Sequence, residues 1–95
     1  MFIVLLKFST EKAKASQFMD EHKAWIKRGF DEGVFLMVGS LKPGAGGVVL
    51  AHNCSLEELE RRAQEDPFVV EKIVSAEILE IDPAKADDRL SFLLA

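Results

Sequence analysis

One histidine, His22, offers the clearest opportunity for acid–base chemistry in this 95-residue chain. It lies among apolar residues that recur every three or four positions, which is the spacing of one face of a helix. A titratable ring in such a stripe must find a hydrogen-bond partner or lose its charge through desolvation. Two interpretations follow. His22 is either a core histidine bonded to a backbone carbonyl, or a general acid or base facing a small cavity between helix and sheet.

The second interpretation needs an acidic partner for His22. Asp31 is nine residues further along the same helix, which rotates it about 180° away and ~13 Å along the axis. Asp66 ends the next helix along the chain, so the tertiary structure can bring it to His22. Because Asp66 precedes Pro67, it is also a good N-cap with proline at the first helical position. Capping leaves the second carboxylate oxygen free to face a histidine.

Three further residues are candidates for contact with a substrate. Trp25 and Phe18 lie about one turn either side of His22 and would wall a pocket, or else pack in the core. Ser40 ends a predicted strand, where its hydroxyl would donate a hydrogen bond to a substrate or be solvated. We interpret His52, at another strand end, as a surface residue.

Hydrophobic periodicity predicts the elements that must position these residues. Residues 2–8 are rich in β-branched and aromatic side chains and are apolar on both faces. In the first helix, Asp20, Lys23, Lys27 and Asp31 fall on the side opposite the apolar stripe. Ser55 and Glu58 form a capping box that opens the second helix, which Asp66 and Pro67 end. We expect strands at 2–8, 34–40, 48–52 and 76–81, a first helix at 11–32, a turn at 42–47 and a short helical turn at 68–73.

This order of elements, β-α-β-β-α-β, is that of the ferredoxin-like α+β fold. We expect one domain over residues 1–95, with a core at about 2–81 and a tail at 82–95. Two helices would cover one face of a four-stranded antiparallel sheet. Because the first strand is apolar on both faces, the other sheet face is expected to be buried in a homodimer. The apolar tail segment, 90–94, would add to that contact or to a higher assembly.

Composition excludes several classes of function. The chain is 48% hydrophobic and 29% charged, with a net charge of −4, which fits a folded globule and argues against nucleic-acid or membrane partners. Val48 to Ala51, the third strand, offers no aromatic side chain for stacking RNA bases. No apolar run reaches the ~20 residues that span a bilayer, and the N-terminus lacks the features of a signal peptide, so we expect a cytoplasmic protein.

Metal and cofactor motifs are also missing from the sequence. Neither a cysteine pair nor a close histidine pair offers a zinc site, and the glycines at 44–47 are not followed by the lysine of a phosphate loop. We therefore expect no metal and no organic cofactor. Cys54, which is the one cysteine, lies beside a helix N-terminus. Such a position can lower a thiol pKa, but we interpret Cys54 as a buried structural cysteine.

Three short motifs in a particular order carry a resemblance to a known family. His22 in the first helix is followed by Asp31-Glu32-Gly33, which leads into Val38-Gly39-Ser40, and then by Glu65-Asp66-Pro67-Phe68-Val69. From Phe2 to about Ile81 the chain resembles the YCII-related family. These proteins are small dimeric α+β barrels, similar in fold to muconolactone isomerases, and they include chloromuconolactone dehalogenase-like members.

The resemblance implies a site centred on a histidine and an aspartate, which by position are His22 and Asp66. Asp31 also matches a family motif, but the helical geometry weakens it as a direct partner of His22. The chain departs from the family pattern where Ser40 replaces a frequent proline after glycine, and in a compact loop at 42–47. Both departures bear on the substrate more than on the fold.

Two functional hypotheses remain. The first is a small cofactor-free enzyme in which Asp66 orients His22 and favours its protonated form, while the imidazole moves a proton on a small anionic or lactone-like substrate. Isomerisation, elimination and hydrolysis all suit such a pair, so the enzyme would be an isomerase, a lyase or a hydrolase. The alternative is a non-catalytic module that binds a small ligand or serves as an accessory subunit, with His22 as a structural hydrogen-bonding residue.

Overall fold

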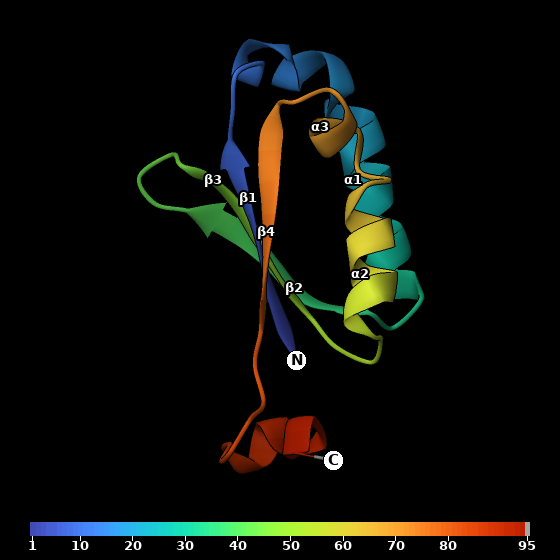
Figure 1. The fold of residues 1–95 in the computed structure, drawn as a ribbon, viewed down its shortest axis with the longest axis vertical. Helices are drawn as coiled ribbons and strands as arrows, with labels where there is room; N and C mark the ends of the chain where they lie inside the picture. The colour runs from blue at the N-terminus through green and yellow to red at the C-terminus, as the bar shows by residue number, and fades with distance from the viewer. Residues whose placement is uncertain (95) are drawn as a thin grey trace.

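The chain folds into the predicted β-α-β-β-α-β order, and the short helical turn expected before the last strand is present as a helix (Figure 1). The computed structural model describes residues 1–94. Its elements are β1 (Phe2–Phe8), the 3-10 turn η1 (Lys12–Lys14), α1 (Ala15–Asp31), β2 (Phe35–Leu41), β3 (Gly46–Ala51), α2 (Leu56–Ala63), α3 (Pro67–Val70), β4 (Val74–Glu80) and the 3-10 segment η2 (Asp88–Leu94).

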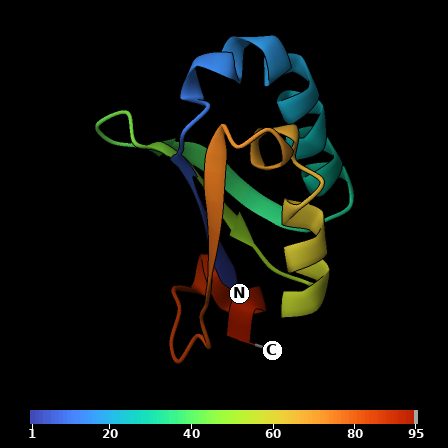
Figure 2. The same cartoon turned by 45° about the horizontal axis from the view of Figure 1, so that its top comes forward.

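The four strands form one antiparallel sheet in the order β2-β3-β1-β4. Helices α1, α2 and α3 all lie against the same face of this sheet (Figures 1 and 2). On central strand β1, Phe2, Val4 and Leu6 are buried beneath the helices, whereas Ile3 and Leu5 alternate toward the face that carries no helix. The ferredoxin-like α+β fold predicted from the sequence is therefore confirmed.

The first helix begins later than its periodicity predicts. Residues from Lys12 form a 3-10 turn, and the α-helix starts only at Ala15, with no side chain capping its first turn. The backbone N–H groups of Ser9 and Glu11 instead bond to the carbonyls of Ile73 and Lys72, which ties this segment to the start of β4. Tertiary hydrogen bonds thus replace a local cap as the start signal of α1.

The hairpin between β2 and β3 is tighter than predicted, because Gly46 and Gly47 belong to β3 and not to the turn. Gly46 has φ 131°, and a Cβ atom there would collide with the backbone carbonyl of Leu6 on β1. Only glycine combines this conformation with so close an approach of two strands.

Both predicted helix-start signals on the second half of the chain are present. The Ser55 hydroxyl accepts from the Glu58 amide, and the Glu58 carboxylate accepts from the Ser55 amide, which completes the capping box of α2. Asp66 caps α3, with Pro67 at its first position. The chain therefore turns sharply between α2 and α3, and Asp66 lies at that turn.

After β4 the chain runs past the end of the sheet near the N-terminus and finishes in η2 (Figures 1 and 2). Leu90, Phe92 and Leu94 are exposed there, and the Phe92 ring packs edge-on against His52 at a centroid distance of 5.5 Å. None of the helices within residues 1–94 combines the length and the apolar character needed to cross a membrane.

The distance between α1 and the sheet depends on a glycine. Gly29 is buried in the last part of α1, and a Cβ atom there would overlap the ring of Phe35 at the start of β2. The Phe35 ring also packs edge-on against Trp25, whose indole N–H donates to the carbonyl of Arg62 at 2.9 Å. These contacts hold α1 against both β2 and α2.

We expect Gly29→Ala to destabilise the protein by about 1–3 kcal/mol, although alanine is the better helix former, because the buried Phe35 ring must move. Urea unfolding measures this change. As a control on the same helix, exposed Ala24→Gly should cost only about 0.5–1 kcal/mol, the difference in helix propensity. A Gly29→Ala variant more stable than the native protein would contradict the close contact between Gly29 and the Phe35 ring.

Candidate functional site

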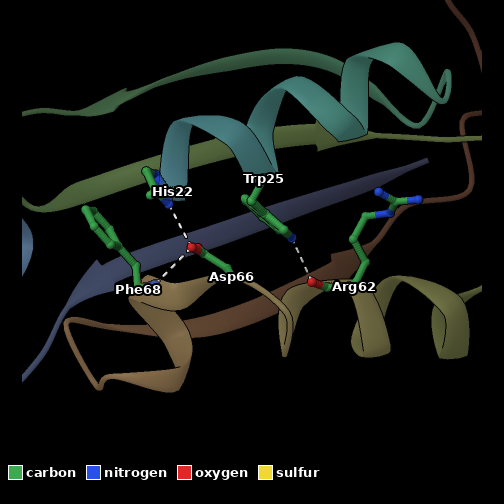
Figure 3. Close-up of polar contacts among 5 residues, drawn as sticks. All are labelled: His22, Trp25, Arg62, Asp66 and Phe68. Carbon is green, nitrogen blue, oxygen red and sulfur yellow. Dashed lines mark hydrogen bonds and ion pairs between the residues drawn. The ribbon is translucent and has the colours of Figure 1, made fainter. Parts of the chain in front are cut away.

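The side chains of His22 and Asp66 meet between α1 and the start of α3 (Figure 3). His22 Nδ1 lies 2.8 Å from Asp66 Oδ1. Because an ionised carboxylate only accepts hydrogen bonds, Nδ1 carries the proton and donates it. The Asp66 side chain is 0% exposed and that of His22 13% exposed, so the pair lies almost entirely out of water.

One oxygen of Asp66 serves both of its partners. Oδ1 accepts from the backbone N–H of Phe68 at 3.0 Å, as the cap of α3, and also from His22. The expectation that capping and contact with the histidine would use different oxygens is wrong. The second oxygen, Oδ2, is buried without a hydrogen-bond partner among residues 1–94. Figure 3 shows both contacts ending on this one oxygen, one from His22 on α1 and one from the backbone of Phe68 on α3.

The His22 ring is fixed in its plane by an aromatic neighbour that sequence reasoning missed. The ring of Phe68 stacks on it at a centroid distance of 3.9 Å and an interplanar angle of 4°. Trp25 lies further away, at 5.9 Å and 22°. The Asp-Pro-Phe motif therefore supplies both the carboxylate and the stacking partner of the histidine. The hydrogen bond at Nδ1 and the stacking of Phe68 on the ring face together fix the orientation of the His22 ring.

A cavity of about 290 Å³ lies beside His22, between α1 and the sheet. His22 contributes to its wall, and with Nδ1 occupied by Asp66 the other ring nitrogen, Nε2, is the one available to a ligand. Most of the remaining lining is apolar. It comprises Leu6, Phe8, Met19, Lys23, Ile26, Val38, Gly39, Ser40, Gly46, Gly47, Val48, Phe68 and Val74.

Gly47 makes room for this cavity. In the sheet register it pairs with Leu6 on β1 and with Ser40 on β2, so all three positions lie on the helix-covered face. A side chain at position 47 would extend into the space that His22 and Ser40 line. Glycine within a strand often marks a place where a ligand approaches the backbone.

The structure brings three of the predicted site residues together and separates two from them. His22 and Ser40 both line the cavity, and Asp66 is bonded to His22 without being part of the lining. Trp25 is absent from the lining and is buried in the core against Phe35. Phe18 lies at a different surface groove, together with Val70 and Glu71. The spacing of one helical turn placed both aromatics near His22 along α1, but each points to another part of the fold.

Lys23 is a lining residue that the helical periodicity assigned to the outer face. Neighbouring residues on a helix differ by about 100°, so Lys23 flanks the stripe that contains His22. It belongs to the cavity lining and is nevertheless exposed, as a long side chain with an apolar stem and a charged end allows. The charge pattern along α1 predicted that Lys23 is exposed, but it did not predict that Lys23 also lines the cavity.

Cys54 is a partly buried free cysteine, which agrees with a structural role. Partial burial raises the pKa of its thiol, the Glu58 carboxylate raises it further, and the opposing effect of Arg62 is smaller. The start of α2 therefore does not lower this pKa, which agrees with the interpretation of Cys54 as a structural cysteine. Among residues 1–94 no group of three histidine, cysteine, aspartate or glutamate side chains is arranged to hold a metal ion.

A solved structure with a similar fold is the 5-chloro-2-hydroxyhydroquinone dehydrochlorinase TftG from Burkholderia phenoliruptrix AC1100, in complex with 2,5-dihydroxybenzoquinone. The superposition has a TM-score of 0.68 and covers 85% of this chain and 93% of that chain, at 12% sequence identity. At this identity the likeness concerns the fold. No curated protein matches the sequence.

The sequence itself matches the family model of the YCII-related domain over residues 1–82. That span contains the whole sheet, the three α-helices and the His22–Asp66 pair, and it leaves out only the C-terminal segment that includes η2. The motifs around His22 and Asp66 thus gave the correct resemblance, and the chain belongs to the YCII-related family.

Proposed function

We propose that this protein is a small cofactor-free enzyme that transfers a proton on a small organic, lactone- or acid-like substrate. The observation that carries the proposal is the 2.8 Å contact between His22 Nδ1 and the buried Asp66 carboxylate, beside a cavity of about 290 Å³. A histidine oriented by a carboxylate at one nitrogen, with the other nitrogen toward a ligand site, is the arrangement of a general base.

In the proposed mechanism Nε2 of His22 takes a proton from the substrate. The imidazolium that results is stabilised by the Asp66 carboxylate at Nδ1, in surroundings of low dielectric constant where this attraction is stronger than in water. The same ring can return the proton to another substrate atom, which gives isomerisation, or leave a carbanion that expels a leaving group, which gives elimination. Ser40 lies across the cavity and can donate a hydrogen bond to a substrate oxygen.

The structural neighbour suggests the first compounds to test. TftG is named for dehydrochlorination of 5-chloro-2-hydroxyhydroquinone, an elimination in which a proton and a chloride ion leave the substrate. This reaction needs a base and no redox partner, and it fits a single-ring substrate. We therefore include this compound, with chlorinated lactones and their acids, among the substrates for measuring turnover.

A non-catalytic role is the second candidate, and the Phe68 contacts favour it. The stacked Phe68 ring and the shared Oδ1 join α1 to α3, as a structural histidine would. In that case replacing His22 would mainly lower the stability of the fold, and there would be no turnover for the substitution to reduce. A comparison of stability and turnover in the same variant separates the two candidates.

We expect His22→Gln to lower turnover by at least ~10²-fold, since general acid–base catalysis contributes that much or more. Chloride release and incorporation of solvent deuterium into substrate measure the reaction, and circular dichroism verifies the fold. His52→Gln is the matched control because His52 lies outside the cavity lining. Undiminished turnover in His22→Gln, or no reaction of the native protein with any compound tested, contradicts the enzymatic proposal.

Asp66→Ser separates capping from orientation of the histidine. Serine still caps α3 but is too short to reach Nδ1, so we expect a loss of about 1–2 kcal/mol in stability with the fold retained. Nitrogen-15 NMR of the neutral His22 ring should change from the Nδ1–H tautomer to the Nε2–H tautomer, and turnover should fall. An unchanged tautomer would show that Asp66 does not orient the ring.

We also propose that two copies pack their uncovered sheet faces together. Alternating residues that point away from the helices form an apolar patch of Ile3, Leu5, Met37, Val48, Leu50 and Leu79. Met37 and Leu79 are 44% and 42% exposed in the single chain. Water would otherwise contact this apolar surface across all four strands, and burying it against a copy removes that cost.

Light scattering after size exclusion should therefore give the mass of a dimer at micromolar concentration. Met37→Lys should shift the mass toward that of a monomer, because it places a charge in the patch. Val70→Lys is the control, since Val70 is 58% exposed but lies on α3, on the helix side. A monomer mass for the native protein would refute the dimer.

A further inference from the structure

The titratable residues that line the cavity beside His22 are basic, although the protein as a whole carries a net charge of −4. The titratable side chains in its lining are His22 and Lys23, and no carboxylate belongs to the lining. Asp66, the acid behind His22, is fully buried and already bonded to that ring. Any positive charge on His22 is therefore compensated, whereas the charge of Lys23 is not.

Lys23 also differs from the next lysine of α1. Lys27 forms an ion pair with Asp31, with Nζ 2.6 Å from Oδ2. Among residues 1–94 no carboxylate pairs with Lys23, which belongs to the lining of the cavity. Lys12, which is not part of the lining, lies with its Nζ 4.7 Å from the centre of the ring of Phe8, a lining residue. The lining thus includes one cation without an acidic partner in the described part of the chain, Lys23, among largely apolar walls.

We propose that this cavity binds a small organic anion with an apolar body, and that Lys23 is the residue that positions its negatively charged oxygen atoms. The inference rests on the proposed function and names its substrate class. The apolar body would lie among Leu6, Phe8, Val38 and Phe68, and the anionic group would face the rim. This orientation brings the carbon atoms of the ligand, and not its charged group, toward Nε2 of His22.

The size of the cavity limits the anion. At about 290 Å³ it is at the small end of ligand pockets, which run from roughly 300 to 1,000 Å³. One substituted ring or a short branched acid fits this space, and a nucleotide does not. Gly47 sets this limit from the sheet side, because a side chain there would occupy the floor of the cavity. A larger residue at position 47 should therefore prevent binding without touching Lys23.

Benzoate and benzamide test the charge of the ligand, because they have nearly the same shape and differ in charge. Binding is followed through the amide NMR signals of Gly47 and Ser40 in the purified native protein, whatever its oligomeric state. We expect benzoate to bind on the order of fivefold more tightly than benzamide, the strength of a largely exposed ion pair. High salt should reduce the preference.

Lys23→Gln should abolish the preference for benzoate, and Lys27→Gln, with the same change of charge on the same helix, should preserve it. Gly47→Val should weaken both probes. Equal binding of the two probes to the native protein, an undiminished preference in Lys23→Gln, or shifts confined to residues outside the cavity would each overturn the proposal. Absence of any shift at Gly47 up to about 20 mM probe would overturn it as well.

This test is separate from that of the proposed function. His22→Gln retains Lys23 and the apolar walls, so it should still prefer benzoate even where its turnover is lost. If His22→Gln keeps full turnover, the proton-transfer mechanism fails while the probe preference still decides the role of Lys23. If the native protein shows no preference for benzoate but His22→Gln is inactive, the proposed anion site is refuted and the proton-transfer mechanism stands.

Discussion

The hydrogen bonds to one oxygen of Asp66 are the constraint on which the site depends. Asp66 is fully buried, and burial of a carboxylate is costly unless donors surround it. Its Oδ1 receives two such donors, the amide of Phe68 and the ring of His22. Because the first belongs to α3 and the second to α1, one carboxylate fixes two helices relative to each other. The position of the His22 ring over the cavity follows from this contact.

Much of this arrangement could be predicted because it has local signals. The stripe on the first helix marks His22 as a polar residue on a buried face, and Asp66-Pro67 marks a helix start whose side chain turns inward. The element order then places the two helices side by side on one sheet face. Local rules and one topological rule thus made the His22–Asp66 pair a candidate, and the family resemblance pointed to the same two residues.

The rest of the site has no local signal. Gly47 reads as part of a turn, and only the pairing of β3 with β1 and β2 shows that it forms the floor of the cavity. Lys23 reads as an outer residue, since periodicity gives the direction of a Cβ atom but not the reach of a long side chain. Trp25 and Phe18 are aromatic neighbours of His22 along the helix, yet the direction of each is decided by what packs against it.

The chemistry chosen at position 66 favours a functional over a purely structural role. A structural histidine needs only a backbone carbonyl, and a helix cap needs only a hydroxyl or an amide. A carboxylate meets both needs at the additional cost of a buried charge, and its Oδ2 has no partner among residues 1–94. What a carboxylate adds is the stabilisation of positive charge on the histidine ring. That property matters when Nε2 gains a proton, and Nε2 is the ring nitrogen left for the cavity.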